Sequence, residues 1–111
     1  MELTPFEFVT STTEGVILLA RDEPMLVQAL IPSDAIDAYF GLSEPSNRDR
    51  QNLIIANLPA FSRIATGKYD RQESNLRAPP GVHVAYLRIS LFDIQSSGED
   101  IKRAGVHPDL G

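Results

Sequence analysis

Short apolar runs separated by polar turns predict three strands near the start of the chain. The aliphatic and β-branched runs at 16–20 and 25–31 are typical of strands. The polar segment 21–24 between them ends in proline, which predicts a β-hairpin with a loop of about four residues. An apolar run at 3–9 contains Pro5. Because proline has no amide hydrogen, we expect this run to be an edge strand.

The middle of the chain has helical spacing. We expect Ser33 to cap a helix with Asp34 in its first turn, and Gly41 to end it in the left-handed conformation. Apolar residues three or four apart predict a longer helical segment at 48–67. Pro59 lies inside this segment, where it either kinks one helix or opens a second one.

The last apolar run, 82–92, has apolar residues on both faces, which is typical of a central, covered strand. The polar, proline-containing segment 68–81 before it predicts a long loop. We predict one domain at 1–94 and a polar C-terminal tail at 95–111. Because strands and helices come in runs, the predicted fold class is α+β: a small antiparallel sheet (the hairpin plus a C-terminal strand) with two or three helices packed on one face.

Four of these segments together resemble a known family. They are the strand MLVQALI, the capped helix SDAIDAYFG, the helical segment FSRIATGKYDR and the last strand LRISLFDI. On these segments, residues 15–94 resemble a family of short bacterial proteins, the domain of unknown function numbered 1488. The resemblance implies a small soluble α+β module, and it transfers no catalytic residue.

Charge is distributed unevenly along the chain. Residues 1–47 have eight acids and one base, a formal charge of −7, whereas residues 48–111 have nine bases and seven acids, so the whole chain is −5. Such asymmetry indicates either an interaction surface or a solvated polar face. The candidate protein-binding residues come from the acidic half and from the basic cluster that follows it: Glu14, Asp22, Glu23, Asp34, Asp37, Glu44, Arg48, Arg50, Arg63 and Tyr69.

The composition argues against several kinds of chemistry. With no cysteine, the chain has no disulfide, thiolate metal site or cysteine nucleophile. His83 and His107 lack metal-site spacing, and one interpretation of His83 is a buried, hydrogen-bonded strand residue. Asp34 and Asp37 are explained by the helix dipole rather than by acid–base catalysis. Nucleophile-elbow and phosphate-loop motifs are absent from the sequence, so we predict no enzyme activity, no metal and no cofactor.

Two functions stand as hypotheses. The first is a non-catalytic protein-interaction module that pairs with a second copy of itself or with another protein through the apolar N-terminal strand at 3–9. The second is a small acidic inhibitor of phage or plasmid type, which mimics nucleic acid and occupies the basic site of a nucleic-acid-binding protein.

Partner classes and location follow from the same features. An acidic chain does not favour direct binding to nucleic acid. No apolar run approaches the roughly 18–20 residues of a membrane span, so we expect no membrane partner. The start of the chain lacks the positive region of a signal peptide, and we therefore predict a cytoplasmic protein.

Overall fold

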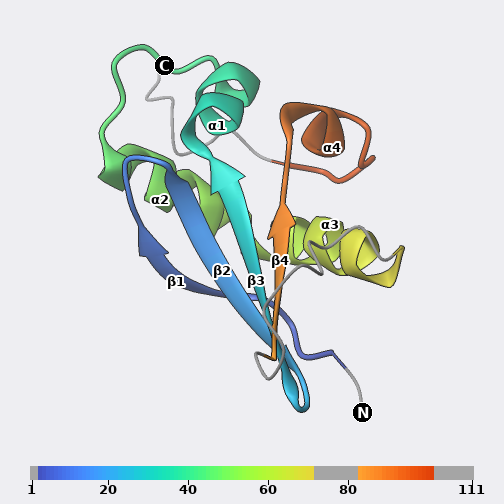
Figure 1. The fold of residues 1–111 in the computed structure, drawn as a ribbon. Helices are drawn as coiled ribbons and strands as arrows, with labels where there is room; N and C mark the ends of the chain where they lie inside the picture. Colours follow the sequence, from blue (N-terminus) through green and yellow to red (C-terminus); the bar gives the residue numbers. More distant parts are fainter. Residues whose placement is uncertain (1–2, 72–82, 102–111) are drawn as a thin grey trace.

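A computed structural model describes residues 3–71 and 83–101, which form a four-stranded sheet and four helices (Figure 1). The strands, which lie side by side in chain order, are Glu7–Ser11 (β1), Gly15–Asp22 (β2), Met25–Pro32 (β3) and Val84–Arg88 (β4). The helices are Ser33–Phe40 (α1), Asn47–Ala56 (α2), Leu58–Asp70 (α3) and Leu91–Gln95 (α4). The predicted α+β class, a small sheet with helices packed on one face, is confirmed.

The sheet is mixed rather than wholly antiparallel. β1, β2 and β3 pair antiparallel, but β4 runs parallel to β3. The β2–β3 hairpin is tighter than expected, since Asp22 lies opposite Met25 and only Glu23 and Pro24 form the turn. The connection from β3 to β4 contains three helices, which is enough chain to return to the same end of the sheet and enter it in parallel.

The last strand is an edge strand, so the prediction of a central, covered strand at 82–92 is wrong. Within β4, Leu87 is buried while its neighbour Tyr86 is exposed, so one face is covered and the other open. The chain leaves the sheet because Ser90 opens α4. The Ser90 hydroxyl accepts from the Asp93 amide, and the Asp93 carboxylate accepts from the Ser90 amide.

The first helix begins differently from the expectation. Pro32 is the residue before its first turn, and the Ser33 hydroxyl makes no cap; it donates instead to the Thr13 carbonyl at 2.9 Å. This bond ties the start of α1 to the turn between β1 and β2. The predicted end is confirmed, since Gly41 has a left-handed φ of 66°.

Pro59 separates two helices. α2 ends at Ala56 and α3 begins at Leu58, with Pro59 in its first turn, where a missing amide hydrogen leaves no helical bond unmade. The second of the two alternatives for 48–67 is therefore correct. Because α3 extends to Asp70, the predicted loop at 68–81 is wrong at its start. Its remainder from residue 72 lies outside the described residues.

The N-terminal segment belongs to the core. β1 starts only at Glu7, and Phe6 before it is 1% exposed, with its amide donating to the Ser62 hydroxyl of α3 at 2.9 Å. Thr4 exchanges two hydrogen bonds with Arg21 on β2. The edge position predicted for this segment is confirmed for β1. The apolar residues of the segment are only partly exposed, since Phe6 is buried, Phe8 is half-buried and Val9 is 51% exposed.

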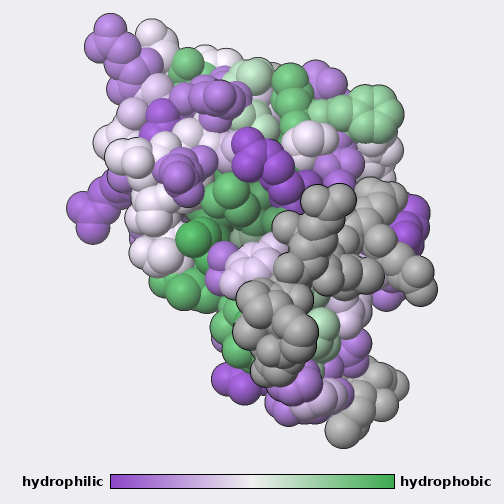
Figure 2. Space-filling view, viewed as in Figure 1, coloured by the Kyte–Doolittle hydropathy of each residue, from purple (hydrophilic) through white to green (hydrophobic). Residues whose placement is uncertain are grey.

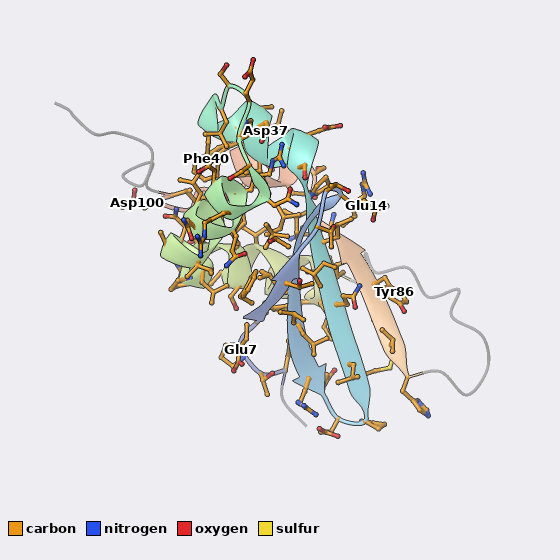
Figure 3. All side chains as sticks on the ribbon, turned by 90° about the vertical axis from the view of Figure 1, so that its left-hand side faces the viewer. Glu7, Glu14, Asp37, Phe40, Tyr86 and Asp100 are labelled. Carbon is orange, nitrogen blue, oxygen red and sulfur yellow. The ribbon has the colours of Figure 1, made fainter. Side chains whose placement is uncertain are left out.

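The core lies between the sheet and the helices. Figures 1 and 3 show α2 and α3 on one side of the sheet, and α1 and α4 beyond the ends of β3 and β4. Alternate residues of the strands point into this layer and are almost completely buried: Val16, Leu18, Ala20, Val27, Ala29, Ile31, Ala85 and Leu87. The other face of the sheet is turned away from the helices.

Candidate interaction surfaces

The predicted acidic residues lie at two ends of the molecule rather than on one surface. Asp22 and Glu23 are at the β2–β3 turn, whereas Glu14 precedes β2 at its other end, about eight strand residues or roughly 26 Å away. Asp34 and Asp37 share that second end with Glu14 because α1 begins there (Figure 3). This separation does not favour a nucleic-acid mimic, which needs a continuous acidic field.

Asp37 joins the acidic half of the chain to the basic half. Its two carboxylate oxygens accept from Arg50 Nε at 2.8 Å and Nη2 at 2.9 Å, so a forked pair holds α1 against α2. The hydrogen bond to Asp37 raises the pKa of the Arg50 guanidinium. Asn47 accepts a further bond from Arg50 Nη1. Asp37 and Arg50 are therefore structural partners of each other.

Tyr69 makes a second link between the halves. Its hydroxyl donates to Asp22 Oδ2 at 2.8 Å, which connects α3 to the end of β2. Burial, followed by the hydrogen bond to Asp22, raises the pKa of the Tyr69 hydroxyl. Glu23, next to Asp22, lies 4.0 Å from Arg21, and both of these side chains are exposed. Of the ten predicted residues, Asp22, Asp37, Arg50 and Tyr69 thus contribute to packing between elements.

Of the other predicted residues, Glu14 and Asp34 line one hollow beside the start of α1, whereas Glu44, Arg48 and Arg63 belong to other segments. Glu14, Asp34 and Arg48 are exposed, and so is Glu44, which has a left-handed φ of 52° in the loop before α2. Arg63 projects from α3, and its Nε and Nη2 atoms lie 2.8 Å and 2.7 Å from Glu99 Oε1.

One apolar surface of the described residues is not predicted by the sequence patterns. We call it the open face: the strand residues that alternate with the core positions and point away from the helices. Pairing across the strands brings together six half-buried or exposed apolar residues, with the polar Gln28 between Leu19 and Tyr86 and with Arg21 and Arg88 at the two ends. The six are Ile17, Leu19, Leu26, Leu30, Val84 and Tyr86. None belongs to the core cluster or packs against it, and Tyr86 is 43% exposed.

The figures show the open face directly. Figure 2 looks onto it and shows a hydrophobic area in the middle of this side of the molecule, over β2 and β3. Figure 3 shows Tyr86 pointing to the side opposite the helices. The signal for this surface was present in the sequence, because both alternating sets of residues in 16–20 and 25–31 are apolar apart from Gln28.

A second surface is a polar groove between α3 and α4, which we call the α3–α4 groove. It encloses about 430 Å³ and is lined mainly by Arg63, Gly67, Arg71, Phe92, Asp93 and Glu99. Phe92 is 73% exposed, the highest fraction among the exposed large hydrophobic residues. Beside the groove, Lys68 Nζ donates to Asp93 Oδ2 at 2.9 Å.

Asp93 is hydrogen-bonded to both Lys68 and Ser90. Burial by itself raises the pKa of the carboxyl, but the hydrogen bonds from Lys68 and Ser90 outweigh it, so the pKa of Asp93 lies below its usual value. Because Asp93 also caps α4, this ionised carboxylate holds α4 to α3.

The two histidines and the acidic residues are potential metal ligands, because both types can bind a metal ion. Within residues 3–71 and 83–101, no group of three potential ligands is placed to hold a metal ion. His83 is exposed at the start of β4 rather than buried, and its carbonyl accepts from the Leu26 amide. His107 lies outside the described residues. No helix among the described elements is long and apolar enough to cross a membrane.

Comparison with known proteins adds no relative: no family model, no curated protein and no solved structure matches the chain. The resemblance of residues 15–94 to the domain of unknown function 1488 therefore stays a prediction.

Proposed function

We propose that this protein is a non-catalytic interaction module that associates with a second copy of itself through the open face of its sheet. The observation that carries the proposal is the apolar character of that face, which the described helices leave uncovered. Contiguous apolar patches of a few hundred Å² occur on most small soluble proteins, and the largest of them is often an interaction site.

The dimensions of the face suit a small dimer interface. Three strands about 4.8 Å apart and up to eight residues long give a face of about 14 Å by 26 Å. Its flat area is roughly 370 Å², to which the protruding side chains add further accessible surface. A stable interface buries about 800 Å² on each partner. The open face supplies the apolar centre of such an interface, and the polar residues around it supply the rim.

The charges at the rim favour a second copy over an unrelated partner. At one end, Arg88 lines the same hollow as Glu14 and Asp34. At the other end, Arg21 lies 4.0 Å from Glu23. Each end of the strands therefore has charges of both signs. In a dimer whose twofold axis runs along or across the strands, a basic residue of one copy comes near an acidic residue of the other.

The test compares two substitutions at equally exposed apolar positions. Tyr86→Lys places a charge on the open face, whereas Ile55→Lys places it on α2, where the side chain is 42% exposed. We expect the wild type and Ile55→Lys to have a dimer mass by size-exclusion chromatography with light scattering, and Tyr86→Lys to have a monomer mass. A monomeric wild type at high micromolar concentration, or a Tyr86→Lys dimer, would contradict the proposal.

A further inference from the structure

The middle of the open face has a polar residue, Gln28. The paired residues of β2, β3 and β4 that point to this side form three rows of three across the strands. Row by row, they are Arg21, Leu26 and Val84; Leu19, Gln28 and Tyr86; and Ile17, Leu30 and Arg88. Gln28 is therefore the central residue, with apolar or aromatic neighbours on both adjacent strands and at both nearest positions along β3.

The side chain of Gln28 has no partner of its own within the monomer. It is half-buried, and among residues 3–71 and 83–101 its carboxamide makes no hydrogen bond. Water can supply the missing partners while the open face is exposed. A purely apolar surface laid over the face would remove that water and leave the amide unsatisfied, which is unfavourable. A stable occupant of the face must therefore bring both a donor and an acceptor to Gln28.

A second copy of the chain brings such a group by symmetry. Two sheets that pack face to face in a twofold dimer are related by an axis that lies in the plane between them. The overlap of two equal faces is largest when this axis passes through their centre. The central residue of one copy then lies opposite the same residue of the other, whether the axis runs along the strands or across them.

Glutamine has the chemistry to pair with itself. Its carboxamide has N–H donors on Nε2 and an acceptor in Oε1, so each copy can donate to the other and accept from it. Two carboxylates or two ammonium groups at the same place would repel each other. Two leucines would pack in many registers, whereas a single buried amide pair selects one, as buried asparagines do in coiled coils.

We propose that Gln28 lies on the twofold axis of a face-to-face dimer and pairs with Gln28 of the second copy through two hydrogen bonds between their carboxamides. This proposal rests on the self-association proposed above, and it names the residue that sets the symmetry and register of the dimer. The apolar residues around Gln28 supply affinity. Gln28 itself disfavours partners and registers that leave its amide without hydrogen bonds.

Opposite charges at position 28 test whether this residue meets its own copy. Gln28→Glu keeps the shape of the side chain, and the long side chain of Gln28→Lys can reach solvent in the monomer, so both variants should fold. Circular dichroism and urea unfolding check this. We expect each variant alone to dimerise at least about a hundredfold more weakly than the wild type, because like charges meet on the axis. An equimolar mixture should recover the dimer mass in size-exclusion chromatography with light scattering, because each dimer then contains one carboxylate and one ammonium group.

Gln95 is the matched control, since it is an exposed glutamine at the end of α4, beyond the end of β4 (Figure 1). Gln95→Glu and Gln95→Lys should each keep the dimer mass on their own. If the wild type is a dimer but the mixture of Gln28 variants stays monomeric, Gln28 does not meet its own copy, and this proposal is overturned while self-association stands. A dimer formed by either Gln28 variant alone also overturns it. A monomeric wild type contradicts self-association itself, and the pairing of Gln28 with it.

Discussion

Leu18 and Leu19 are neighbours on β2, yet they lie in different environments. Leu18 points into the helix layer and is completely buried, whereas Leu19 points to the open face and keeps part of its surface in contact with solvent. The same holds for Ile31 and Leu30 on β3. Apolar strand residues thus have two roles in this protein: one set holds the monomer together, and the other is available to a partner.

The largest effect on the free energy of unfolding is expected when leucine is replaced by alanine on the covered face rather than on the open face. Leu18→Ala should lower the free energy of unfolding by about 2–5 kcal/mol, because it leaves a cavity between the sheet and the helices. Leu19→Ala should lower it by about 1 kcal/mol or less in dilute protein, because solvent already reaches this side chain. Urea unfolding of both variants measures the two values. Equal losses would mean that the two faces are equally packed.

Much of the fold could be predicted from local patterns. The runs at 16–20 and 25–31 are strands and Gly41 ends the first helix, as predicted. For Pro59 two alternatives were left open, and the structure shows that it begins a new helix. These features depend on residues close in the sequence, so a single sequence is informative about them. The predicted last strand is too long because it was based on the apolar alternation in 82–92 alone. The capping pattern of Ser90 and Asp93, which begins a helix there and ends the strand, was not taken into account.

The surfaces were harder to predict because they depend on contacts between distant residues. Arg63 and Glu99 are 36 positions apart, and Asp22 and Tyr69 are 47 apart, so no spacing rule brings them together. Charge counts alone assigned Asp37 and Arg50 to a binding surface, although they bind each other. One source of the error is the last apolar run, 82–92, which was interpreted as a strand covered on both faces rather than as one with a covered and an exposed face. For the runs at 16–20 and 25–31, no prediction distinguished the two faces.

The next effect concerns a polar contact in the covered layer. Ser62→Ala should lower the free energy of unfolding by about 1–3 kcal/mol, because the buried Phe6 amide loses its acceptor. Ser96→Ala is the control, since the Ser96 hydroxyl is in an exposed bond to the Phe92 carbonyl and should matter little. Chemical denaturation compares the two. A Ser62→Ala variant as stable as the control would show that the N-terminal segment is not held by this bond.

A pH-dependent effect tests how the helix layer is joined. Because hydrogen bonds from Lys68 and Ser90 hold the pKa of Asp93 below its usual value of 3.8, the ionised carboxylate stabilises the folded state above that pH. This contribution is lost as the pH falls through the lower folded pKa. Asp93→Asn should therefore be less stable than the wild type at pH 7, and the difference should shrink below pH 3.8. Thermal melts from pH 7 to pH 2 follow this, and a constant difference would exclude ionisation as the cause.

The smallest effect on the monomer is expected at the open face itself. Tyr86→Thr keeps a residue suited to a strand, so in dilute protein it should change the free energy of unfolding by no more than about 0.5 kcal/mol. Association adds a concentration-dependent stability to any protein whose folded state dimerises. The melting temperature of the wild type should therefore rise between low and high micromolar protein, and that of Tyr86→Thr should not. If the melting temperatures of both proteins rose equally with concentration, the contact between copies would lie somewhere other than around Tyr86. The covered face would in that case still be the source of monomer stability.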